Sequence, residues 1–454
     1  MRKKKPSKKR RGVEHRVIER RAFEAVIWGM PVVNYDLMRQ EMVRKTKAKV
    51  NQVVYWGRPL DSKNQTLTPN PDALYFMAFF STKDGPIVLE VPSGDANGSF
   101  NGNIVTTWQM PLEDAGLLGH DKGAGAKYLV LPPGYTGPKS DGYVALQSDT
   151  FGGYALIRSN FRSHSDADVA KSVAYGKQVK VYPLASAASP APTVFIDAKD
   201  VLFDSTIRYD ESFFESLNRV VQEEPWLARD RAMIDSLKSL GIEKGKPFRP
   251  DAATKMIFAA AARDAHEWLE QRYDAGFPPF FSAKSRWTYP AHPDVIKAQQ
   301  NAFSEPDAYP VDLRGVGYSY AYVGIKHLGV GQMYMISIRD KAGKPFDGAK
   351  NYRLRVPPNA PVEQYWSVTA YDRETHALIR GMPRASRSSQ IPELRKNDDG
   401  SIDVYFGPKP PKNMESNWVP TDRKRRFELM FRAYAPTKAL FDKKWVLPDV
   451  ERAK

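Results

Sequence analysis

The run from Phe427 to Tyr434 constrains the fold more than any other stretch of this sequence. One face of the run carries apolar side chains: Phe427, Leu429, Phe431 and Ala433. The alternate positions carry Glu428, Met430, Arg432 and Tyr434. A period of two is the pattern of a β-strand whose two faces meet different surroundings. The sequence therefore predicts a long strand close to the C-terminus.

A second strand precedes it. Asp399 and Gly400 form a tight-turn dipeptide, and the residues from Ile402 to Phe406 again alternate. The prolines that follow cannot donate to a sheet, so they end the strand. The region predicts two strands that flank a loop carrying Trp418.

The whole chain is expected to be an α+β protein. It has 454 residues, of which 42% are hydrophobic and 12% aromatic, and its 35 prolines exceed its 30 glycines. Short aromatic runs bounded by turn residues favour β-sandwiches. Helical periodicity instead appears between residues 210 and 273. We expect two β-sandwich-like domains of the jelly-roll type with an intervening helical region.

The sequence suggests four segments. Residues 1–15 are expected to form a disordered basic tail, and 16–190 a β-rich domain with an N-terminal helix. Residues 191–308 should form the helical region, and 309–454 a second β-sandwich domain. Pro31 is expected to break or kink the first helix, and His266 to lie in solvent on the charged flank of a later one. Ser165 is the expected cap of a helix over residues 166–179.

Composition and charge exclude several classes of protein. The absence of cysteine excludes disulfides, thiolate catalysis and Cys-based metal sites. The net charge is +16, and eight of the basic residues lie between Arg2 and Arg11. Nucleic acid is therefore expected to bind only through this tail, if at all. No apolar stretch is long enough to predict a transmembrane helix, and the basic start lacks the apolar segment of an export signal.

No metal or cofactor is predicted. The seven histidines are scattered, without the i, i+2 or i, i+4 spacing of a metal site. The Asn397–Gly400 run lacks the acidic residue that would close a calcium loop. The glycine-rich segment from Gly116 to Gly125 matches neither a phosphate-binding loop nor a Rossmann turn.

The best candidate residues of the N-terminal half lie in a rigid turn. Pro69 and Pro71 bracket it, and it presents Asn70, Asp72 and Tyr75. A rigid turn holds side chains at low entropic cost, as a functional loop requires. We expect Asp72 as a catalytic acid or base and Asn70 and Tyr75 as substrate-binding residues. The alternative is that these side chains cap the backbone of a structural turn.

The C-terminal half adds further candidates. Arg432 and Tyr434 share one strand face, and they could line a polar pocket if Trp418 and Asp372 come close. Asp372 is the second candidate acid or base, with a structural Arg–Asp pair as the alternative. Arg387 lies among serines in an arginine-rich loop, a pattern that suits anion binding better than a catalytic triad. Trp108, near the end of a predicted strand, completes the substrate-binding set.

The chain resembles a pair of domain families. Four C-terminal motifs resemble the DUF1214 domain: Asn397–Ser401, Asn417–Pro420, Phe431–Pro436 and Trp445–Pro448. Three N-terminal motifs resemble its usual companion, DUF1254: Asn70–Tyr75, Pro86–Pro92 and Tyr128–Pro132. Gln109 and Asp114 are approximate counterparts of a family glutamine and aspartate. The resemblance implies β-sandwich domains with helical material, often exported or periplasmic proteins, and no assigned function.

Three functions stay open. The first is a hydrolase or lyase acting on a small or polymeric anionic or polyhydroxylated substrate. The second is a non-catalytic ligand-binding protein, and the third is an oligomeric structural or assembly protein. We also expect a homo-oligomer. The residue patterns favour the first function slightly, because both β regions carry fixed polar loops.

Overall fold

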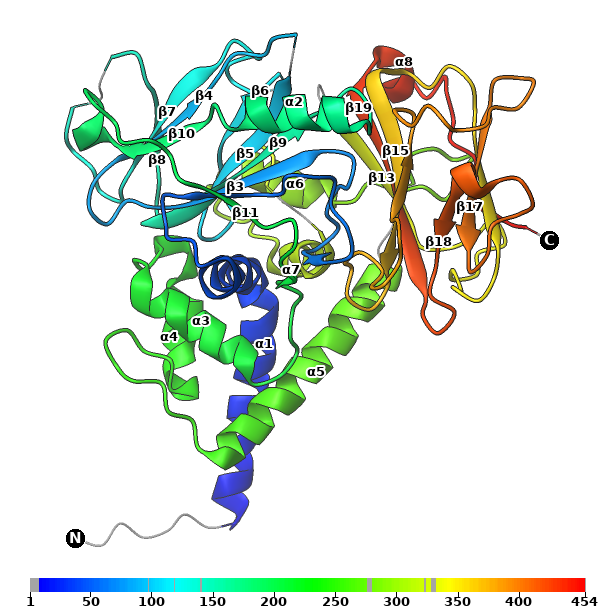
Figure 1. Ribbon diagram of the computed structural model, residues 1–454. Coiled ribbons are helices and arrows are strands. Elements are labelled where there is room, and N and C mark those ends of the chain that lie inside the picture. The colour runs from blue at the N-terminus through cyan, green and yellow to red at the C-terminus, as the bar shows by residue number, and fades with distance from the viewer. Residues whose placement is uncertain are drawn as a thin grey trace, which may run out of the picture.

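The computed structural model shows an α+β protein with two sheet domains and a helical part (Figure 1). This agrees with the fold class that the sequence predicts. The structure describes residues 8–96, 98–117, 119–138, 141–275, 280–321, 324–327 and 332–453.

The N-terminal β domain is built from two sheets that pack face to face. The larger has the order β11-β1-β3-β9-β5-β6 and the smaller β10-β4-β7-β8. The strands of the larger sheet are β1 (Val53–Tyr55), β3 (Leu74–Ser81), β5 (Ser99–Thr106), β6 (Pro111–Gly116), β9 (Gly152–Asn160) and β11 (Phe195–Asp197). Those of the smaller are β4 (Ile87–Val91), β7 (Ala126–Leu131), β8 (Val144–Gln147) and β10 (Lys180–Pro183). Two short strands, β2 (Asn64–Gln65) and β12 (Phe203–Asp204), pair separately.

Strand β3 explains how this domain joins the rest of the protein. Phe76, Ala78 and Phe80 point into the core between the two sheets. Tyr75 and Met77, on the opposite face, belong to a second core shared with the helices and the C-terminal domain. Both faces of β3 are therefore buried, as a nearly continuous apolar run requires. Helix α2 (Asp166–Gly176) packs against this domain and begins at Ser165, whose side chain accepts a hydrogen bond from the amide of Asp168, as the sequence predicts.

The C-terminal β domain also has two sheets, with the orders β13-β19-β15-β16 and β18-β17-β14-β20. The strands of the first are β13 (Gln332–Ser337), β15 (Val362–Asp372), β16 (Ser386–Ser388) and β19 (Phe427–Pro436). Those of the second are β14 (Tyr352–Val356), β17 (Ile402–Gly407), β18 (Trp418–Pro420) and β20 (Glu451–Arg452). The apolar face of β19 lies in the core between these sheets. Its polar face is buried too, because it packs toward the N-terminal domain.

The helical part forms its own core below the N-terminal domain (Figure 1). Its long helices, α1 and α5, run side by side to the end of the molecule at which the N-terminus lies. The α-helices are α1 (Lys8–Glu41), α3 (Ser212–Glu223), α4 (Arg231–Leu237), α5 (Ala252–Ala275), α6 (Pro293–Gln300) and α7 (Val311–Tyr320), and a π-helical turn, Met42–Thr46, extends α1. Short helix α8 (Lys438–Phe441) belongs to the C-terminal domain, and 3-10 turns occupy Leu184–Ser186, Ala228–Asp230, Lys238–Leu240 and Glu415–Asn417.

Several local expectations differ from the structure. The predicted tail is helical from Lys8 onward, while residues 1–7 lie outside the described residues. Of the two outcomes predicted at Pro31, a break or a kink, the break does not occur, because α1 continues through it. Proline cannot donate to the carbonyl four residues earlier, and helix α7 packs against that point. A Cβ on Gly315 of α7 would lie 2.8 Å from the carbonyl oxygen of Ile27, so the close approach requires glycine.

The predicted exposure of His266 differs from the structure. His266 is not free in solvent: its ring stacks on Tyr209 with a centroid distance of 3.8 Å.

The segments predicted from the sequence are not separate bodies in the structure. Helix α1 packs on α3, α5 and α7, and α7 itself lies within the segment predicted as the C-terminal sandwich. Strand β11, in the segment predicted as helical, pairs with β1 of the N-terminal sheet. The segments predicted from the sequence therefore interleave in space.

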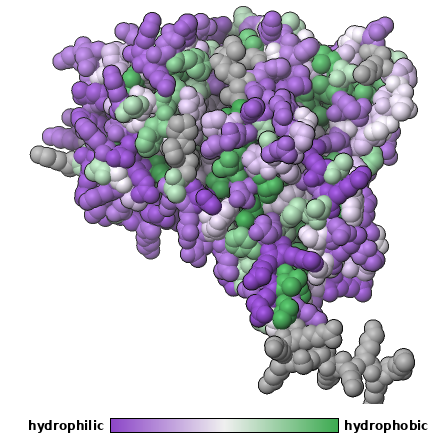
Figure 2. Space-filling model, turned by 180° about the vertical axis from the view of Figure 1, so that it is seen from behind, coloured by the Kyte–Doolittle hydropathy of each residue, from purple (hydrophilic) through white to green (hydrophobic). Residues whose placement is uncertain are grey.

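The surface is largely hydrophilic. The face shown in Figure 2 carries apolar residues only in scattered groups among polar ones. Within the described ranges, no helix is both long enough and apolar enough to span a bilayer.

Candidate functional site

The turn from Thr68 to Tyr75 lies buried between the two β domains. The backbone amide of Asn70 donates to the Tyr75 hydroxyl at 2.7 Å, and that of Asp72 donates to Asn70 Oδ1 at 3.0 Å. Asn70 and Asp72 are only 1% and 0% exposed. The two prolines and these internal hydrogen bonds therefore give the turn a fixed shape.

Strands β15 and β19 of the C-terminal domain hold this turn. Asn70 Nδ2 donates to the Tyr434 hydroxyl at 2.7 Å, and Arg432 Nη2 donates to the carbonyl oxygen of Thr68 at 2.9 Å. The Tyr365 hydroxyl donates to the carbonyl oxygen of Asp72 at 3.0 Å. The predicted residues of the N-terminal turn and those of β19 thus come together, although more than 300 residues separate them in the sequence.

A cavity of about 110 Å³ lies beside this turn. Its wall combines arginines, tyrosines and amides with apolar side chains from both β domains and from α1. The lining residues are Asn34, Met38, Thr66, Leu67, Thr68, Tyr75, Met77, Asn103, Gln109, Tyr154, Leu156, Arg158, Pro290, Ala321, Ile325, Gln332, Tyr334, Met430 and Arg432.

Two buried arginines give the cavity its charge. Arg158 lies on β9 and Arg432 on β19, and they are 6% and 2% exposed. Arg158 Nη1 donates to Asn103 Oδ1 at 3.3 Å, and Arg432 Nη1 donates to Thr369 Oγ1 at 3.1 Å. Neither forms an ion pair with a carboxylate of the described chain, and the Nε of each lacks a hydrogen-bond partner there.

Such a pair of charges is costly without an anion. A guanidinium stays protonated in proteins, and burying an unpaired charge costs several kcal/mol. Aromatic rings offset part of this cost: Arg432 Cζ lies 5.1 Å from the Tyr334 ring centroid, and Arg158 Cζ lies 5.7 Å from that of Tyr75. The cavity is therefore positively charged and electrostatically suited to an anion.

The tyrosines of the cavity act as neutral hydrogen-bonding groups. The Tyr154 hydroxyl donates to Gln109 Oε1 at 2.8 Å, and those of Tyr334 and Tyr434 lie 3.0 Å apart. Burial is the main cause that raises the pKa of Tyr154 and of Tyr434 far above the ordinary value. These phenols therefore keep their protons at neutral pH and add no negative charge.

Asp72 lies at the turn, but its carboxylate is not among the groups that line the cavity. Its Oδ1 accepts a hydrogen bond from Ser386 Oγ at 3.1 Å and lies 3.0 Å from His164 Nε2. Ser386 and Arg387 alternate along β16, so Ser386 faces the turn and Arg387 faces the other way. Arg387 instead donates to the carbonyl oxygen of Ser386 at 3.0 Å.

Three other predicted residues lie elsewhere. Trp108 packs on Trp28 in the helical core, with ring centroids 4.7 Å apart. Trp418 donates from Nε1 to the carbonyl oxygen of Gly407 at 2.8 Å, which seats its loop against β17. Asp372, at the end of β15, forms an ion pair of 2.7 Å with Arg425, as in the structural alternative. The predicted pocket of Asp372, Trp418, Arg432 and Tyr434 is therefore not formed.

Sequence reasoning missed the other half of the cavity. Arg158 is a single charge inside an otherwise apolar strand, which is a signal of a buried polar role. Tyr334 belongs to a tyrosine-rich segment whose significance depends on its position opposite Arg432 in the sheet. Asn103 and Gln109 had no local signal that separates them from structural amides.

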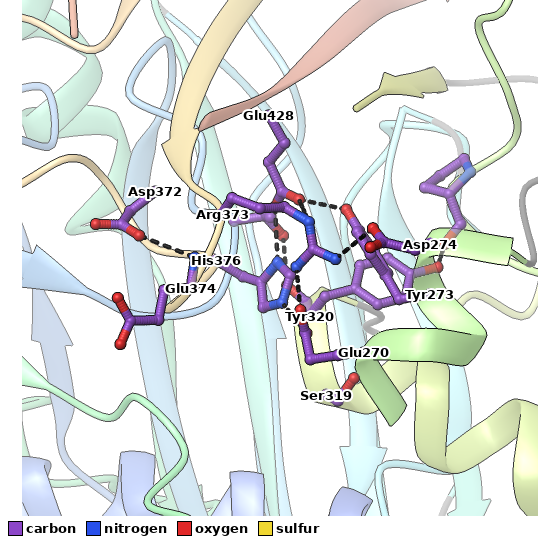
Figure 3. Close-up of polar contacts among 12 residues, drawn as sticks. Glu270, Tyr273, Asp274, Ser319, Tyr320, Asp372, Arg373, Glu374, His376 and Glu428 are labelled. Atoms are coloured by element: carbon purple, nitrogen blue, oxygen red, sulfur yellow. Dashed lines mark hydrogen bonds and ion pairs between the residues drawn. The ribbon is translucent and has the colours of Figure 1, made fainter. Parts of the chain in front are cut away.

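A second buried cluster, also missed, joins helix α5 to the C-terminal sheet (Figure 3). His376 Nδ1 lies 2.8 Å from Glu428 Oε1, and its Nε2 lies 3.4 Å from Glu270 Oε1. Arg373 forms ion pairs with Glu270 at 2.6 Å and Asp274 at 2.8 Å. Burial alone would lower the pKa of His376, but Glu428 and Glu270 raise it to about 9.

The contacts within this cluster indicate a structural role. Every charged member has an oppositely charged neighbour, and Tyr273 donates to Glu428. The members come from α5, β19 and the loop after β15, so the cluster ties the helical part to the C-terminal domain. It adjoins the cavity, since the amide of Thr68 donates to the carbonyl oxygen of His376 at 2.6 Å.

Family models match both β domains. Residues 50–183 match DUF1254 and residues 331–438 match DUF1214, each described as a protein of unknown function. The chain carries a DUF1254 domain followed by a DUF1214 domain. The arginine cavity lies between these two domains, with Arg158 from the DUF1254 domain and Arg432 from the DUF1214 domain.

Solved structures resemble the whole chain. The crystal structure of the VPA0106 protein from Vibrio parahaemolyticus superposes with a TM-score of 0.57 at 17% identity, covering 96% of this chain and all of the other. An uncharacterized protein from Burkholderia cenocepacia has a TM-score of 0.43 at 12% identity, covering 97% of this chain and 96% of its own. Among curated proteins, none matches this chain. The first likeness shows that the fold of this chain, with its two β domains and helical part, recurs in another protein.

Proposed function

We propose that this protein binds a small organic anion in the cavity between its DUF1254 and DUF1214 domains. The observation that carries the proposal is the pair Arg158 and Arg432. Both guanidinium groups are buried, both line one cavity, and neither is paired with a carboxylate of the described chain. A bound carboxylate would supply the missing charge and accept charge-assisted hydrogen bonds from them.

The rest of the lining supports an organic rather than an inorganic anion. Met38, Met77, Leu156, Ile325 and Met430 form an apolar part of the wall. Such surface favours a carbon skeleton, while the arginines hold the charged end. A cavity of about 150 Å³ accommodates benzene, so a volume of about 110 Å³ suits a short-chain acid.

Binding is a better match to this cavity than acid–base catalysis. Among the described residues that line it, none is Asp, Glu or His. A general acid or base must lie within hydrogen-bond reach of the proton that it transfers. Arginines and neutral tyrosines bind and orient an anion without supplying such a group.

A thermal-shift comparison tests the binding proposal. Propionate and lactate are expected to raise the unfolding temperature, whereas propionamide and lactamide, of almost the same shape but uncharged, should not. Saturation at a hundredfold excess over the dissociation constant stabilises a protein by about 2.7 kcal/mol. Arg387→Met serves as the control, since this buried arginine lies outside the cavity and should leave the shift intact. Equal responses to acids and amides would contradict the proposal.

A hydrolase or lyase is the second candidate, and one observation favours it. Asp72 Oδ1 lies 3.0 Å from His164 Nε2, and the His164 side chain is 25% exposed. A buried carboxylate beside a partly exposed imidazole is an arrangement found in acid–base catalysis, although the contact between Asp72 and His164 Nε2 does not have hydrogen-bond geometry in this structure. In this proposal His164 would exchange the proton and Asp72 would orient it.

Replacing Asp72 by asparagine tests this second candidate. A broad hydrolase and lyase screen should show at least one activity that the Asp72→Asn protein loses by about a hundredfold, because the imidazole would lose its orienting charge. Asp398→Asn, in an exposed hairpin turn, is the matched control. Identical activity profiles for wild type and Asp72→Asn would exclude Asp72 from catalysis.

The structural or assembly alternative has less support. The large exposed aromatic residues of the described chain are Trp226, Phe280 and Phe441, and they come from three separate segments of the chain. A broad aromatic surface, which assembly through such contacts would need, is not formed by these residues.

A further inference from the structure

One acceptor in the arginine cavity has no protein partner. Asn34, on helix α1, lines the cavity and is 7% exposed. Its Nδ2 donates to the carbonyl oxygen of Tyr318 at 3.3 Å, which fixes the orientation of the amide. Its Oδ1 accepts no hydrogen bond within the described part of the chain. This oxygen is not fully buried, so a molecule in the cavity can reach it.

The position of Asn34 on the helix directs it toward the ligand space. Met38 lies four residues later, on the same face of α1, and lines the same cavity. Helix α1 is held there by Gln109 Nε2, which donates to the carbonyl oxygen of Pro31 at 2.6 Å. The wall thus presents a fixed acceptor beside an apolar side chain, in the same cavity that Arg158 and Arg432 line.

A ligand that fills the cavity displaces the water that can reach Asn34 Oδ1, so the ligand must offer a hydrogen-bond donor in its place. Leaving an amide oxygen without one is unfavourable, so a ligand that offers a donor binds better than one that does not. The two arginines can only donate, and they require the acceptor oxygens of an anion. A complementary ligand therefore carries an anionic group and a separate donor.

The ligand's donor could be an ammonium group or a hydroxyl group, and the positive charge of the cavity favours the hydroxyl. An ammonium group would lie among two guanidinium groups, with no carboxylate among the described lining residues. Like charges in a buried site repel strongly. A hydroxyl group offers the same donor without charge, so it is the better complement to Asn34 Oδ1.

We propose that the ligand is a small hydroxycarboxylate, with Asn34 as the residue that selects its hydroxyl group. This inference rests on the proposed anion-binding function and specifies its ligand class. Arg158 and Arg432 hold the carboxylate, Asn34 Oδ1 accepts from the hydroxyl, and the methionines pack on the short carbon chain.

Calorimetric titration with matched ligands tests this. The pairs are lactate with propionate, and 3-hydroxybutyrate with butyrate, while alanine replaces the hydroxyl of lactate by an ammonium. Wild type should bind the hydroxy acid of at least one pair about tenfold more tightly than its unsubstituted partner. Alanine should bind more weakly than propionate.

The variants isolate Asn34. Asn34→Leu, of nearly the same shape, should reduce the hydroxy-acid preference to less than about threefold. Asn34→Asp should weaken both acids and improve the binding of alanine relative to them, because it places a negative charge opposite the ammonium. Asn218→Leu, on α3, is the control and should keep the wild-type ratios.

The outcomes separate the two levels of the proposal. Equal affinities within both ligand pairs, or a preference that survives in Asn34→Leu, would overturn the hydroxycarboxylate inference and leave anion binding in place. If none of the acids binds wild type, anion binding itself fails. A reversed order, with alanine the tightest ligand of wild type, would also overturn the inference.

Discussion

Replacing Arg158 and Arg432 together by methionine is expected to weaken the binding of a small carboxylate about a hundredfold or more. Hydrogen bonds to charged groups contribute about 1.5–3 kcal/mol each, and 1.4 kcal/mol corresponds to a factor of ten. Methionine is unbranched and of similar length, so it fills the space without the charge. The dissociation constant, measured by calorimetry at fixed ionic strength, is the readout.

Stability should respond differently from binding. The substitutions remove two buried charges that lack a carboxylate partner in the described chain, which favours folding of the ligand-free protein. They also leave the carbonyl oxygen of Thr68 without the donor Arg432 Nη2, which costs about 1–3 kcal/mol. We therefore expect the free energy of unfolding to stay within about 2 kcal/mol of wild type.

The control is Arg387→Met. This residue is buried like the cavity arginines, at 7% exposure, but faces away from the Asn70 turn. It should leave carboxylate affinity unchanged. A double variant that is folded and binds as tightly as wild type would show that the two guanidinium groups do not hold the anion.

The second large effect concerns the cluster around His376. The pKa of His376 in the folded protein is raised to about 9, whereas an unperturbed histidine has a value of about 6.5. The folded state thus holds the proton more tightly than the unfolded state. The resulting stabilisation is complete below about pH 6.5 and is lost as the pH rises from there through 9. Its size is roughly 3 kcal/mol, from a shift of 1.36 kcal/mol per pKa unit.

Denaturant unfolding of wild type and His376→Gln at pH 6, 7.5 and 9.5 measures this contribution. The difference in free energy between the two proteins should be largest at pH 6 and nearly vanish at pH 9.5. Groups that do not interact with His376 titrate equally in both proteins, so their contributions cancel in the difference. A difference that stays constant over this range would contradict the assignment of a protonated His376.

Glu428→Gln tests the same cluster from its other side. Glu428 is 0% exposed and contacts His376, Arg373 and Tyr273. Removing its charge leaves buried cations with less compensation, which typically costs about 3–5 kcal/mol. Glu374→Gln, on a carboxylate that is 71% exposed and pairs with Arg425, should cost less than about 1 kcal/mol.

Local patterns in the sequence predicted correctly those elements whose structure depends on a few neighbouring residues. The alternation in β19 placed Phe431 in a sandwich core and Arg432 on the opposite face, as observed. The prolines around Asn70 predicted a rigid turn, and Ser165 predicted a helix start. These features depend on side-chain period, backbone restriction and capping, which a few neighbouring residues specify.

Other features depend on which elements meet in space. The polar face of β19 is buried because the DUF1254 domain and the helical part pack on it. Arg158 is identified as a candidate anion-binding group only by its position in the cavity that Arg432 also lines. His376, Glu428 and Glu270 are far apart in sequence and have no spacing that signals a cluster. No local pattern specifies such long-range contacts.

The central claim is that an anion binds between Arg158 and Arg432. A crystal structure of the protein with 3-bromopropionate, recorded at the bromine absorption edge, tests it most directly. The account predicts an anomalous peak inside the cavity, on the side of Met38, Met77 and Met430, with the carboxylate directed at the two guanidinium groups. A peak elsewhere, with the cavity free of ligand at a concentration that saturates binding in solution, would contradict it.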